Sequence, residues 1–403
     1  MTPCPLGLAG NCYCANQASS FTSAPAETAV LLLAHGSPEN PDQIPEFLSY
    51  VTGGRALPPA VVEEIRHRYS LIVFSPLACW TLLQADQLAQ SLQMPVFVGM
   101  RNWKPFVSDT VNAIANQRFE RAIAVCLAPQ NSRTSVGLYR SAVSANGNLP
   151  FKMDFVEEWH DQPLLVKAFA EKLRSGWEKA STENGAKLPI IFTAHSVPER
   201  TIAEGDPYEK QAKETAELVA KEADLPSEDW TFAFQSQGMS GGAWIGPTVE
   251  DTIRNLKAKG HRGVFLHPIG FLCDHVEVLY DIDIAFKQFA EKEGMRLWRA
   301  ESLNGSKMLT EALAAVVSSR MQALGIQRWG RKRRANSHEA RSTKLAAHYE
   351  THSHHWRRNL RPIGRVHHRK KTSGRDAHRV CSVRVQPAPG RCARYGSRRW
   401  LPG

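Results

Sequence analysis

The sequence predicts an α/β protein built from two similar halves, each a doubly wound parallel sheet flanked by helices. Apolar runs that suit buried strands alternate with segments of helical periodicity, which is typical of parallel sheets covered on both faces. The stretches AVLLLAHGSPEN, from Ala29, and PIIFTAHSVPER, from Pro189, also repeat one pattern, a buried strand followed by Ala-His, a small residue and a Pro. Together, the alternation and this repeat divide the chain into two related halves.

The other strands and two helices follow in chain order. The expected strands are VFVGM from Val96, AIAVCLAP from Ala122, FKMDFV from Phe151, IIFTA from Ile190, WTFAFQS from Trp230 and GVFLHPIGF from Gly263. A helix is expected in DPYEKQAKETAELVAKEAD, because Asp206 suits a cap and Pro207 a first turn. PLLVKAFAEKLRSGWEKA predicts another helix. Their apolar stripes are Ala212, Ala216, Val219 and Ala220, and Leu164, Val166, Phe169 and Leu173.

The predicted organisation has four parts. We expect a disordered leader at residues 1–27, an N-terminal α/β half at 28–150, a C-terminal α/β half at 151–327 that carries the catalytic motifs, and a basic disordered tail at 328–403. In folds of this kind the ligand cleft lies beyond the carboxyl ends of the strands. His35 and His195 both lie at that edge, each at the end of one of the repeated strands.

Composition and length exclude several classes of protein. The chain has 403 residues, of which 42% are hydrophobic, so it can bury a substantial core. No apolar run approaches the roughly 20 residues of a membrane span. The N-terminal stretch has no Lys or Arg ahead of its weak apolar segment, which argues against a secretory signal. We therefore expect a cytoplasmic protein with no transmembrane segment.

The net charge of +11 is unevenly distributed. From Arg331 onward there are 20 Lys and Arg against 3 Asp and Glu, which leaves 30 against 36 in the residues before it. A segment so basic and without apolar period is expected to be disordered. It suits either an arm that binds nucleic acid or anionic membranes, or an appended terminus with no selected role. We favour the second interpretation and expect no nucleic-acid partner.

The glycine-rich stretch SQGMSGG, from Ser236, matches no nucleotide-binding motif. It lacks the Lys-Ser/Thr of a phosphate-binding loop and the glycine spacing of a dinucleotide turn. A phosphoryl-transfer enzyme or an NAD enzyme is therefore not expected.

Candidate catalytic side chains lie in the second half. His195 ends one strand, and Glu277 and Asp281, four residues apart, follow another and are expected on one helical face. One alternative is that Asp274 and Glu277 form a capping box, which would give Glu277 a structural role only. An imidazole with neighbouring carboxylates instead suits a divalent metal ion held transiently. No CxxC spacing is present, which disfavours a structural zinc site.

An ordered set of motifs in the second half resembles the ferrochelatases, which insert ferrous iron into a porphyrin at the end of haem synthesis. These motifs are TAHSVPER, GDPYEKQ, FQSQG, WIGPTVEDTI, PIGFLCDHVEVLYDID and LN. The resemblance implies a class II chelatase-like fold, places His195 on the active-site histidine of the family and Glu277 on the glutamate opposite it, and puts Asp281 on the metal-side acidic ridge. The motif EVLYD is more similar to that of bacterial enzymes that use coproporphyrin III than to that of enzymes that use protoporphyrin IX.

The first half departs from the family pattern. Where many relatives have an aromatic residue after the first strand, this chain has His35, within an AHGSP stretch similar to that of sirohydrochlorin chelatases. Aromatic side chains are expected to clamp the macrocycle, and cations or hydroxyls to bind its propionates. The predicted porphyrin-binding residues are His35, Arg55, Ser75, Arg101, Tyr139 and Trp244.

The predicted chemistry divides among three residues. Insertion needs a bent ring, a base for the pyrrole protons and ligands that strip water from iron. His195 suits the base, because a neutral imidazole accepts protons near pH 7. Glu277 is expected to relay protons or hold iron, and Asp281 to pass on Fe²⁺, so the metal site comprises all three. The alternatives are a sirohydrochlorin-type chelatase and a carrier that binds haem or porphyrin without metallating it.

No permanently bound cofactor is expected, and Fe²⁺ is treated as a substrate. Some ferrochelatases carry an iron–sulfur cluster, but Cys4, Cys12 and Cys14 match no cluster spacing, even with Cys381 or Cys392 from the tail. An iron–sulfur cluster is therefore not predicted. A monomer is favoured, with porphyrin and ferrous iron as its binding partners.

Overall fold

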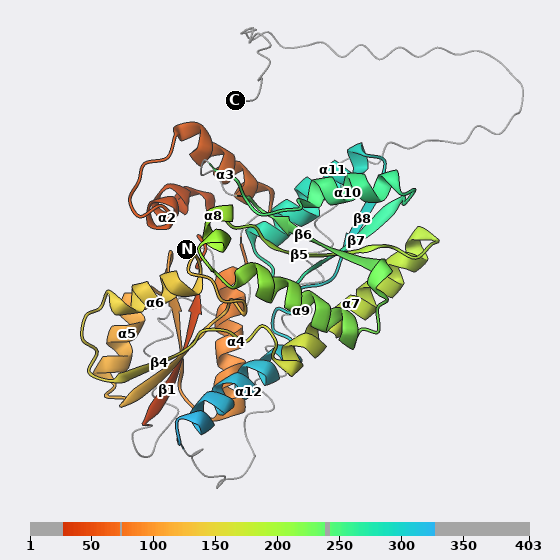
Figure 1. Ribbon diagram of the computed structural model, residues 1–403. Coiled ribbons are helices and arrows are strands. Elements are labelled where there is room, and N and C mark those ends of the chain that lie inside the picture. Colours follow the sequence, from red (N-terminus) through yellow and green to blue (C-terminus); the bar gives the residue numbers. More distant parts are fainter. Residues whose placement is uncertain (1–26, 73–74, 238–241, 327–403) are drawn as a thin grey trace, which may run out of the picture. The chain divides into compact units, whose positions relative to one another are not determined.

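The computed structural model describes residues 27–72, 75–237 and 242–326 (Figure 1). The predicted leader and basic tail lie outside these ranges, apart from Glu27. Two four-stranded parallel sheets form the framework, with strand orders β2-β1-β3-β4 and β6-β5-β7-β8. Their strands are β1 (Thr28–Ala34), β2 (Val96–Met100), β3 (Arg121–Cys126), β4 (Lys152–Val156), β5 (Ile190–His195), β6 (Trp230–Gln235), β7 (Gly263–Pro268) and β8 (Arg296–Arg299).

The identical strand order confirms the prediction of two similar doubly wound halves. In each sheet the first strand has its successor on one side and the third strand on the other, so the chain reverses direction across the sheet there. Ligands bind beside such a reversal, at the carboxyl ends of the strands. β1 is buried along its whole length, as expected for a central parallel strand that reads as one apolar run.

Helices cover both faces of each sheet. They are α2 (Ile44–Val51), α3 (Pro59–Leu71), α4 (Leu77–Leu92), α5 (Val107–Asn116), α6 (Val136–Ser144), α7 (Pro163–Asn184), α8 (Glu199–Ala203), α9 (Tyr208–Glu222), α10 (Val249–Ala258), α11 (Lys287–Lys292) and α12 (Lys307–Ala323), with 3₁₀ turns at Pro41–Gln43 and Ser227–Asp229. Glu277–Phe286 forms a π-helix. No helix in the described ranges has both the length and the apolar character that crossing a membrane requires.

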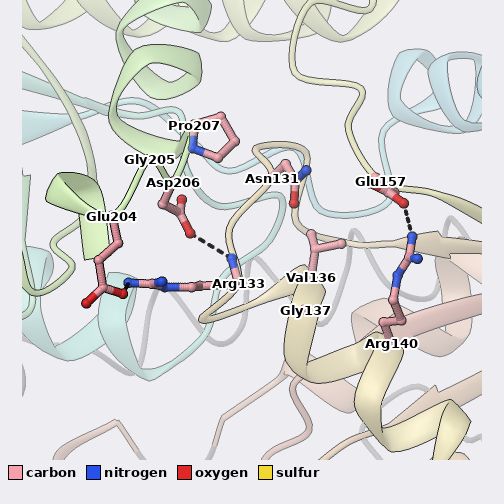
Figure 2. A pocket seen from close by; sticks show the side chains of 10 residues that line it. All are labelled: Asn131, Arg133, Val136, Gly137, Arg140, Glu157, Glu204, Gly205, Asp206 and Pro207. Atoms are coloured by element: carbon pink, nitrogen blue, oxygen red, sulfur yellow. Dashed lines mark hydrogen bonds and ion pairs between the residues drawn. The ribbon is translucent and has the colours of Figure 1, made fainter. Parts of the chain in front are cut away.

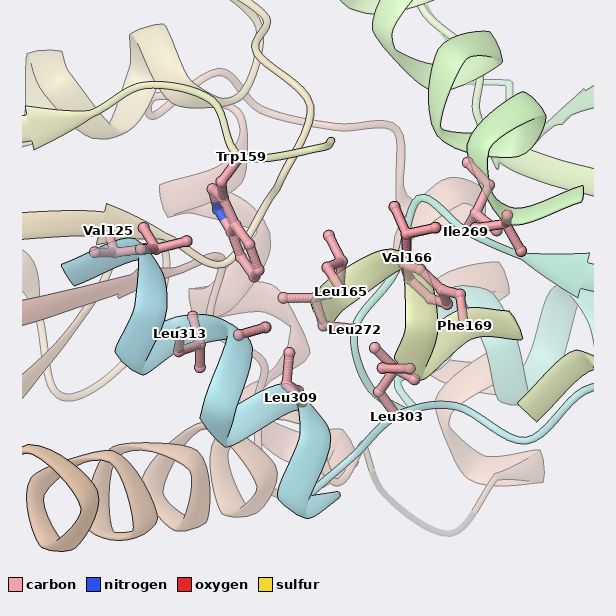
Figure 3. Close-up of a cluster of buried hydrophobic side chains, with 14 of the residues drawn as sticks. Val125, Trp159, Leu165, Val166, Phe169, Ile269, Leu272, Leu303, Leu309 and Leu313 are labelled. Carbon is pink, nitrogen blue, oxygen red and sulfur yellow. The ribbon is translucent and has the colours of Figure 1, made fainter. Parts of the chain in front are cut away.

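One hydrophobic core is shared by the two halves. Leu32 of β1 and Phe192 of β5 belong to the same buried cluster. α12, from the end of the second half, packs on α4 of the first half and on α7 (Figure 1). Figure 3 shows Leu309 and Leu313 of α12 meeting side chains from both halves. The inner faces of the two sheets are therefore joined through these helices.

The outer faces have separate cores. α5 and α6 cover the first sheet. α10, α11 and the π-helix cover the second. The predicted boundary between residues 150 and 151 falls just before β4, which pairs with β3. The last strand of the first sheet thus lies on the C-terminal side of that boundary.

The helices α2 and α3 form an insertion after β1. They enclose a small cluster with Phe47 and Tyr69, and Val276, next to the π-helix, packs against it. Arg68 of α3 also lies over the Tyr280 ring, 5.1 Å from its centroid. The insertion therefore brings the first half against the helix that carries Glu277.

Candidate functional site

His195 is the last residue of β5, at the carboxyl edge of the second sheet. Its Nδ1 donates to the backbone carbonyl of Ser196, because a carbonyl oxygen can only accept. The Nε2 atom is then left with its lone pair, which is the form a general base requires. Tyr208 holds the same residue from α9, since its hydroxyl bonds to the His195 backbone.

The Nε2 atom of His195 faces a carboxylate oxygen, Oε2 of Glu277, at 3.5 Å. Both side chains remain about one-third exposed, at 35% and 31%. The Oε2 atom itself is buried and has no hydrogen-bond partner among the described residues. The imidazole nitrogen and the carboxylate oxygen therefore face each other without a hydrogen bond between them. A proton or a cation would satisfy both.

Glu277 begins the π-helix, and Asp281 lies within it. The expectation of an α-helix here is wrong, because Glu277–Phe286 forms wide turns with i→i+5 bonding. The carboxyl of Asp281 accepts a bond from the Ser236 hydroxyl. Burial raises the pKa of Asp281 to about 6, with a smaller contribution from the charge of Glu277. The two carboxylates thus belong to one electrostatic site, as predicted from their spacing.

The capping-box interpretation of Glu277 is wrong. Val276, not Asp274, precedes the π-helix, and it makes no side-chain capping bond. The carboxylate of Asp274 is directed instead at Ser302 and Asn304. Glu277 is therefore free of the structural role that this alternative would have given it.

His35 follows β1 and has both ring nitrogens occupied. Its Nδ1 donates to the Gly36 carbonyl at 2.9 Å, and its Nε2 accepts from Asn102 Nδ2, also at 2.9 Å. Desolvation by the surrounding protein lowers the pKa of His35 to about 4, helped by the charge of Arg101, although the residue is exposed. The charges of Glu277 and His275 also reach it, so it faces the second half.

Gly36 is required beside this histidine. Its φ is +84°, and a Cβ there would come within 2.8 Å of the Trp103 backbone nitrogen. The backbone turns sharply after His35 and runs close to the segment that carries Asn102, which allows the two side chains to pair.

The other predicted porphyrin contacts are spread over both halves. Arg101 and Tyr139 interact electrostatically, and burial lowers the pKa of Arg101 and raises that of Tyr139. The Trp244 ring lies 6.4 Å from the His195 ring, tilted by 52°. The Ser75 hydroxyl is buried without a hydrogen-bond partner in the described part of the chain. Arg55 lies in the exposed loop after α2, where its Nε donates to the Thr52 carbonyl.

Several residues of the site were missed from the sequence. Gln235 pairs in register with His195 and donates through Nε2 to the Glu277 carbonyl at 3.2 Å. Ser236 and Asn102 fix Asp281 and His35, as described above. Tyr208 and Gln235 fall within GDPYEKQ and FQSQG, two of the motifs that carry the family resemblance. The local sequence does not show that these two residues contact the backbones of His195 and Glu277.

A surface cavity of about 320 Å³ lies elsewhere, at the start of α6 and the turn before α9. Figure 2 shows that its charged groups are paired, Arg140 with Glu157 and the Arg133 backbone with Asp206. None of the predicted catalytic residues lines it. The catalytic candidates therefore do not belong to this cavity.

No cluster of three or more His, Cys, Asp or Glu residues suited to a metal ion occurs within the described ranges, so the structure does not gather His195, Glu277 and Asp281 into a preformed three-ligand site. Cys126 and Cys273 are buried free thiols. The cysteines considered for an iron–sulfur cluster lie outside the described residues. That part of the cofactor expectation stays a prediction.

Comparison with known proteins gives consistent matches. The family model described as "Ferrochelatase" matches residues 27–321. A protein named ferrochelatase from Acidobacterium capsulatum is 50% identical over 310 residues, covering 73% of this chain and 95% of that protein. A coproporphyrin III ferrochelatase from a Geobacillus strain is 33% identical over 307 residues, covering 73% and 97%. Among solved structures, the sirohydrochlorin chelatase SirB from Bacillus subtilis, in complex with cobalt, is 9% identical, with a TM-score of 0.45 over 75% of this chain and 99% of that one.

Proposed function

The chain belongs to the ferrochelatase family and is an enzyme that inserts ferrous iron into a porphyrin, and we propose that its porphyrin is coproporphyrin III and that His195 and Glu277 perform the insertion. One observation carries the mechanism: His195 Nε2 lies 3.5 Å from Glu277 Oε2, a buried carboxylate oxygen with no hydrogen-bond partner among the described residues. A substrate that gives up protons and receives a cation meets the needs of this pair.

The base acts first. A free-base porphyrin carries two pyrrole N–H groups, and both protons must leave as Fe²⁺ enters. Nε2 of His195 accepts a proton, because its Nδ1 already carries one and donates it to Ser196. The resulting imidazolium is stabilised by the carboxylate of Glu277 opposite it. That carboxylate is then the path by which the proton leaves.

The carboxylates act on the metal. Carboxylate oxygens together with one imidazole bind Fe²⁺ without the strong hold of a thiolate set, so the ion can be passed on. Asp281 suits a transfer role, because burial raises its pKa to about 6, close to the pH at which it must exchange a proton for a metal ion. The Ser236 hydroxyl fixes the orientation of its carboxyl group.

The first half supplies the opposite wall of the porphyrin site. His35 serves as a wall of the ring and not as a second base, since both of its nitrogens are engaged. Arg101 of this half offers charge, and Trp244, from the second half, offers aromatic surface beside His195. Tyr139 is 6% exposed and packs in the outer core, so it backs this wall from behind. The Ser75 hydroxyl and the exposed Arg55 remain candidates for propionate binding.

Location and assembly also stay proposals. We place the enzyme in the cytoplasm, because the buried thiols of Cys126 and Cys273 are unpaired, as in a reducing compartment. A monomer without a permanent cofactor or a nucleic-acid partner remains the expectation from the sequence.

The test is a side-by-side insertion assay with Fe²⁺ under anaerobic conditions. Coproporphyrin III is expected to be metallated faster than protoporphyrin IX at matched concentrations, in line with relatives named coproporphyrin III ferrochelatase. Faster turnover of protoporphyrin IX would reverse the assignment of the porphyrin. A shift of the free-base absorption spectrum without its collapse would indicate a carrier.

A further inference from the structure

Asn304, in the loop after β8, forms three hydrogen bonds with the segment that leads to Glu277. Its N–H donates to the Leu272 carbonyl at 2.8 Å, its Oδ1 accepts from the Asp274 N–H at 2.8 Å, and its Nδ2 donates to Asp274 Oδ2 at 3.1 Å. The backbone of Asn304 has a φ of +51°, a conformation that asparagine tolerates better than most residues. Three bonds from one residue thus fix a turn that ends three residues before Glu277.

Arg299 holds the same turn and the π-helix together. Its guanidinium forms two parallel bonds to Asp283, at 2.6 and 2.8 Å, within the π-helix. It also reaches Asp274 Oδ1 at 3.3 Å, which accepts in addition from the Ser302 hydroxyl at 2.7 Å. The side chains of Arg299 and Asp274 are only 15% and 17% exposed, so solvent screens this contact weakly.

The first half is connected to this network. Gln84 of α4 is buried, and its Nε2 donates to the Asn304 carbonyl at 2.7 Å. Gln87 donates to the next carbonyl, that of Gly305, at 3.1 Å. A Cβ on Gly305 would lie 2.7 Å from the Leu83 side chain, so α4 packs directly on this loop. Leu303, beside Asn304, and Leu272 are buried in the shared core (Figure 3).

We infer that Asn304 and Arg299 are positioning residues for Glu277. The Glu277 carboxylate oxygen that faces His195 has no hydrogen-bond partner of its own among the described residues, so its place depends on its backbone. That backbone opens a π-helix that has no side-chain cap. The two residues fix Asp274 before it and Asp283 after it, and so keep the carboxylate opposite the imidazole. This inference rests on the proposed function.

Exchanging the side chains at positions 304 and 274 tests the hydrogen bonds of Asn304. Asn304→Asp sets a carboxylate against Asp274, and Asp274→Asn sets two amide donors against each other. The double variant restores both bonds between positions 274 and 304, because the amide now donates from position 274 and the carboxylate accepts at 304, while the Arg299 contact with position 274 becomes one to a neutral amide oxygen. We expect kcat to fall at least about tenfold in Asn304→Asp and to recover to within about threefold in the double variant, with KM for the porphyrin unchanged throughout.

Two further variants guard against misfolding. Asn304→Gly keeps the backbone conformation and the bond to Leu272, and is expected to lower kcat as Asn304→Asp does. Arg299→Lys keeps the charge but loses the paired bonds, and is expected to lower kcat about fivefold. The matched control is Arg296→Lys, on the same strand and exposed, which should leave kcat unchanged.

Hydrogen exchange of residues 274–286 in the substrate-free enzyme gives a readout independent of activity. Exchange should be faster in Asn304→Asp and return to the wild-type rate in the double variant. Wild-type kcat and exchange in Asn304→Asp, Asn304→Gly and Arg299→Lys would overturn the positioning role and leave the proposed function intact. If the wild-type enzyme metallates no porphyrin while exchange still follows the side-chain swap, the proposed function fails and the structural coupling stands.

Discussion

The two halves share one strand order and place a histidine at the end of the corresponding strand, yet only one of these histidines is equipped as a base. In both, Nδ1 is directed at a backbone carbonyl. In the first half, Nε2 of His35 receives the amide of Asn102. In the second, Nε2 of His195 faces the carboxyl group of Glu277 at 3.5 Å, and no amide donates to it among the described residues. On the proposed mechanism, the side chain opposite each histidine, and not the histidine or its backbone, determines which of the two acts as the base.

The largest difference should appear when each histidine is removed. His195→Ala removes the base and should lower iron insertion by about 10² to 10⁴, while stability changes by about 0.5 kcal/mol or less because the side chain is partly exposed. His35→Ala should act mainly through porphyrin KM and lower kcat less than about tenfold. Steady-state insertion assays and thermal melts of both variants measure this. Equal losses of kcat would show that the halves are not divided in this way.

Glu277→Gln makes the second half resemble the first, because the new amide can donate to His195 Nε2 as Asn102 does to His35. Iron insertion should fall at least about tenfold, since the lone pair that accepts the pyrrole proton is then occupied. The matched control is Glu250→Gln, at the start of α10, where activity should be unchanged. Near-normal insertion in both Glu277→Gln and His195→Ala would contradict the mechanism.

A third histidine, His267, sharpens the comparison, because it is enclosed by aromatic packing in the core. It is 1% exposed, neither ring nitrogen is hydrogen-bonded within the described residues, and the rings of Phe169 and Phe192 lie 5.7 and 5.6 Å away. Burial lowers its pKa to about 3. Because this folded-state pKa lies below the unfolded value, its contribution to stability is complete above pH 6.5 and falls as the pH drops toward 3.

His267→Leu should remove that pH dependence. At pH 5 the wild type should have lost about 2 kcal/mol of unfolding free energy through this residue relative to pH 8, and the variant should keep it. Urea unfolding curves at pH 5 and 8 test the difference. Parallel losses in the two proteins would show that His267 gains a partner or is hydrated in solution.

Asn102→Asp makes the reverse change in the first half. A carboxylate opposite His35 favours the imidazolium, so the pKa of His35 should rise from about 4 by more than about one unit. Titration of the ring protons by NMR measures the shift. Activity should change little, because His35 is not the base. An unchanged pKa would mean that desolvation alone, and not the Asn102 contact, sets the state of this ring.

Much of the fold follows from local patterns. Buried parallel strands read as apolar runs, and the repeated Ala-His endings reveal the duplication. The sequence does not distinguish the π-helix from an α-helix, because EVLYDIDIAF also suits α-helical periodicity. The wide turns coincide with contacts to distant residues, such as Asp283 with Arg299, 16 residues away, which no local pattern shows. Local sequence favours Asp274 as a helix cap, because its actual partners, Ser302 and Asn304, lie about 30 residues farther along the chain.

The site was predicted in part. His195 and Glu277 stand at neighbouring strand ends, and the family resemblance selected them. Asn102 could not be found, because its pairing with His35 depends on how two loops approach each other over 67 residues. A sequence shows which side chains have the chemistry to act as a base or a metal ligand. Which of them are left without a partner depends on packing.

The packing of α12 has a consequence for how such a duplicated protein can change. This helix comes from the second half but fills the space beside α4 of the first. Each half expressed alone would expose an apolar seam that its partner normally covers, and would tend to aggregate. The two halves are thus no longer separable modules. We expect them to unfold as one cooperative unit, and a substitution in α12 to shift the strand ends of both halves at once.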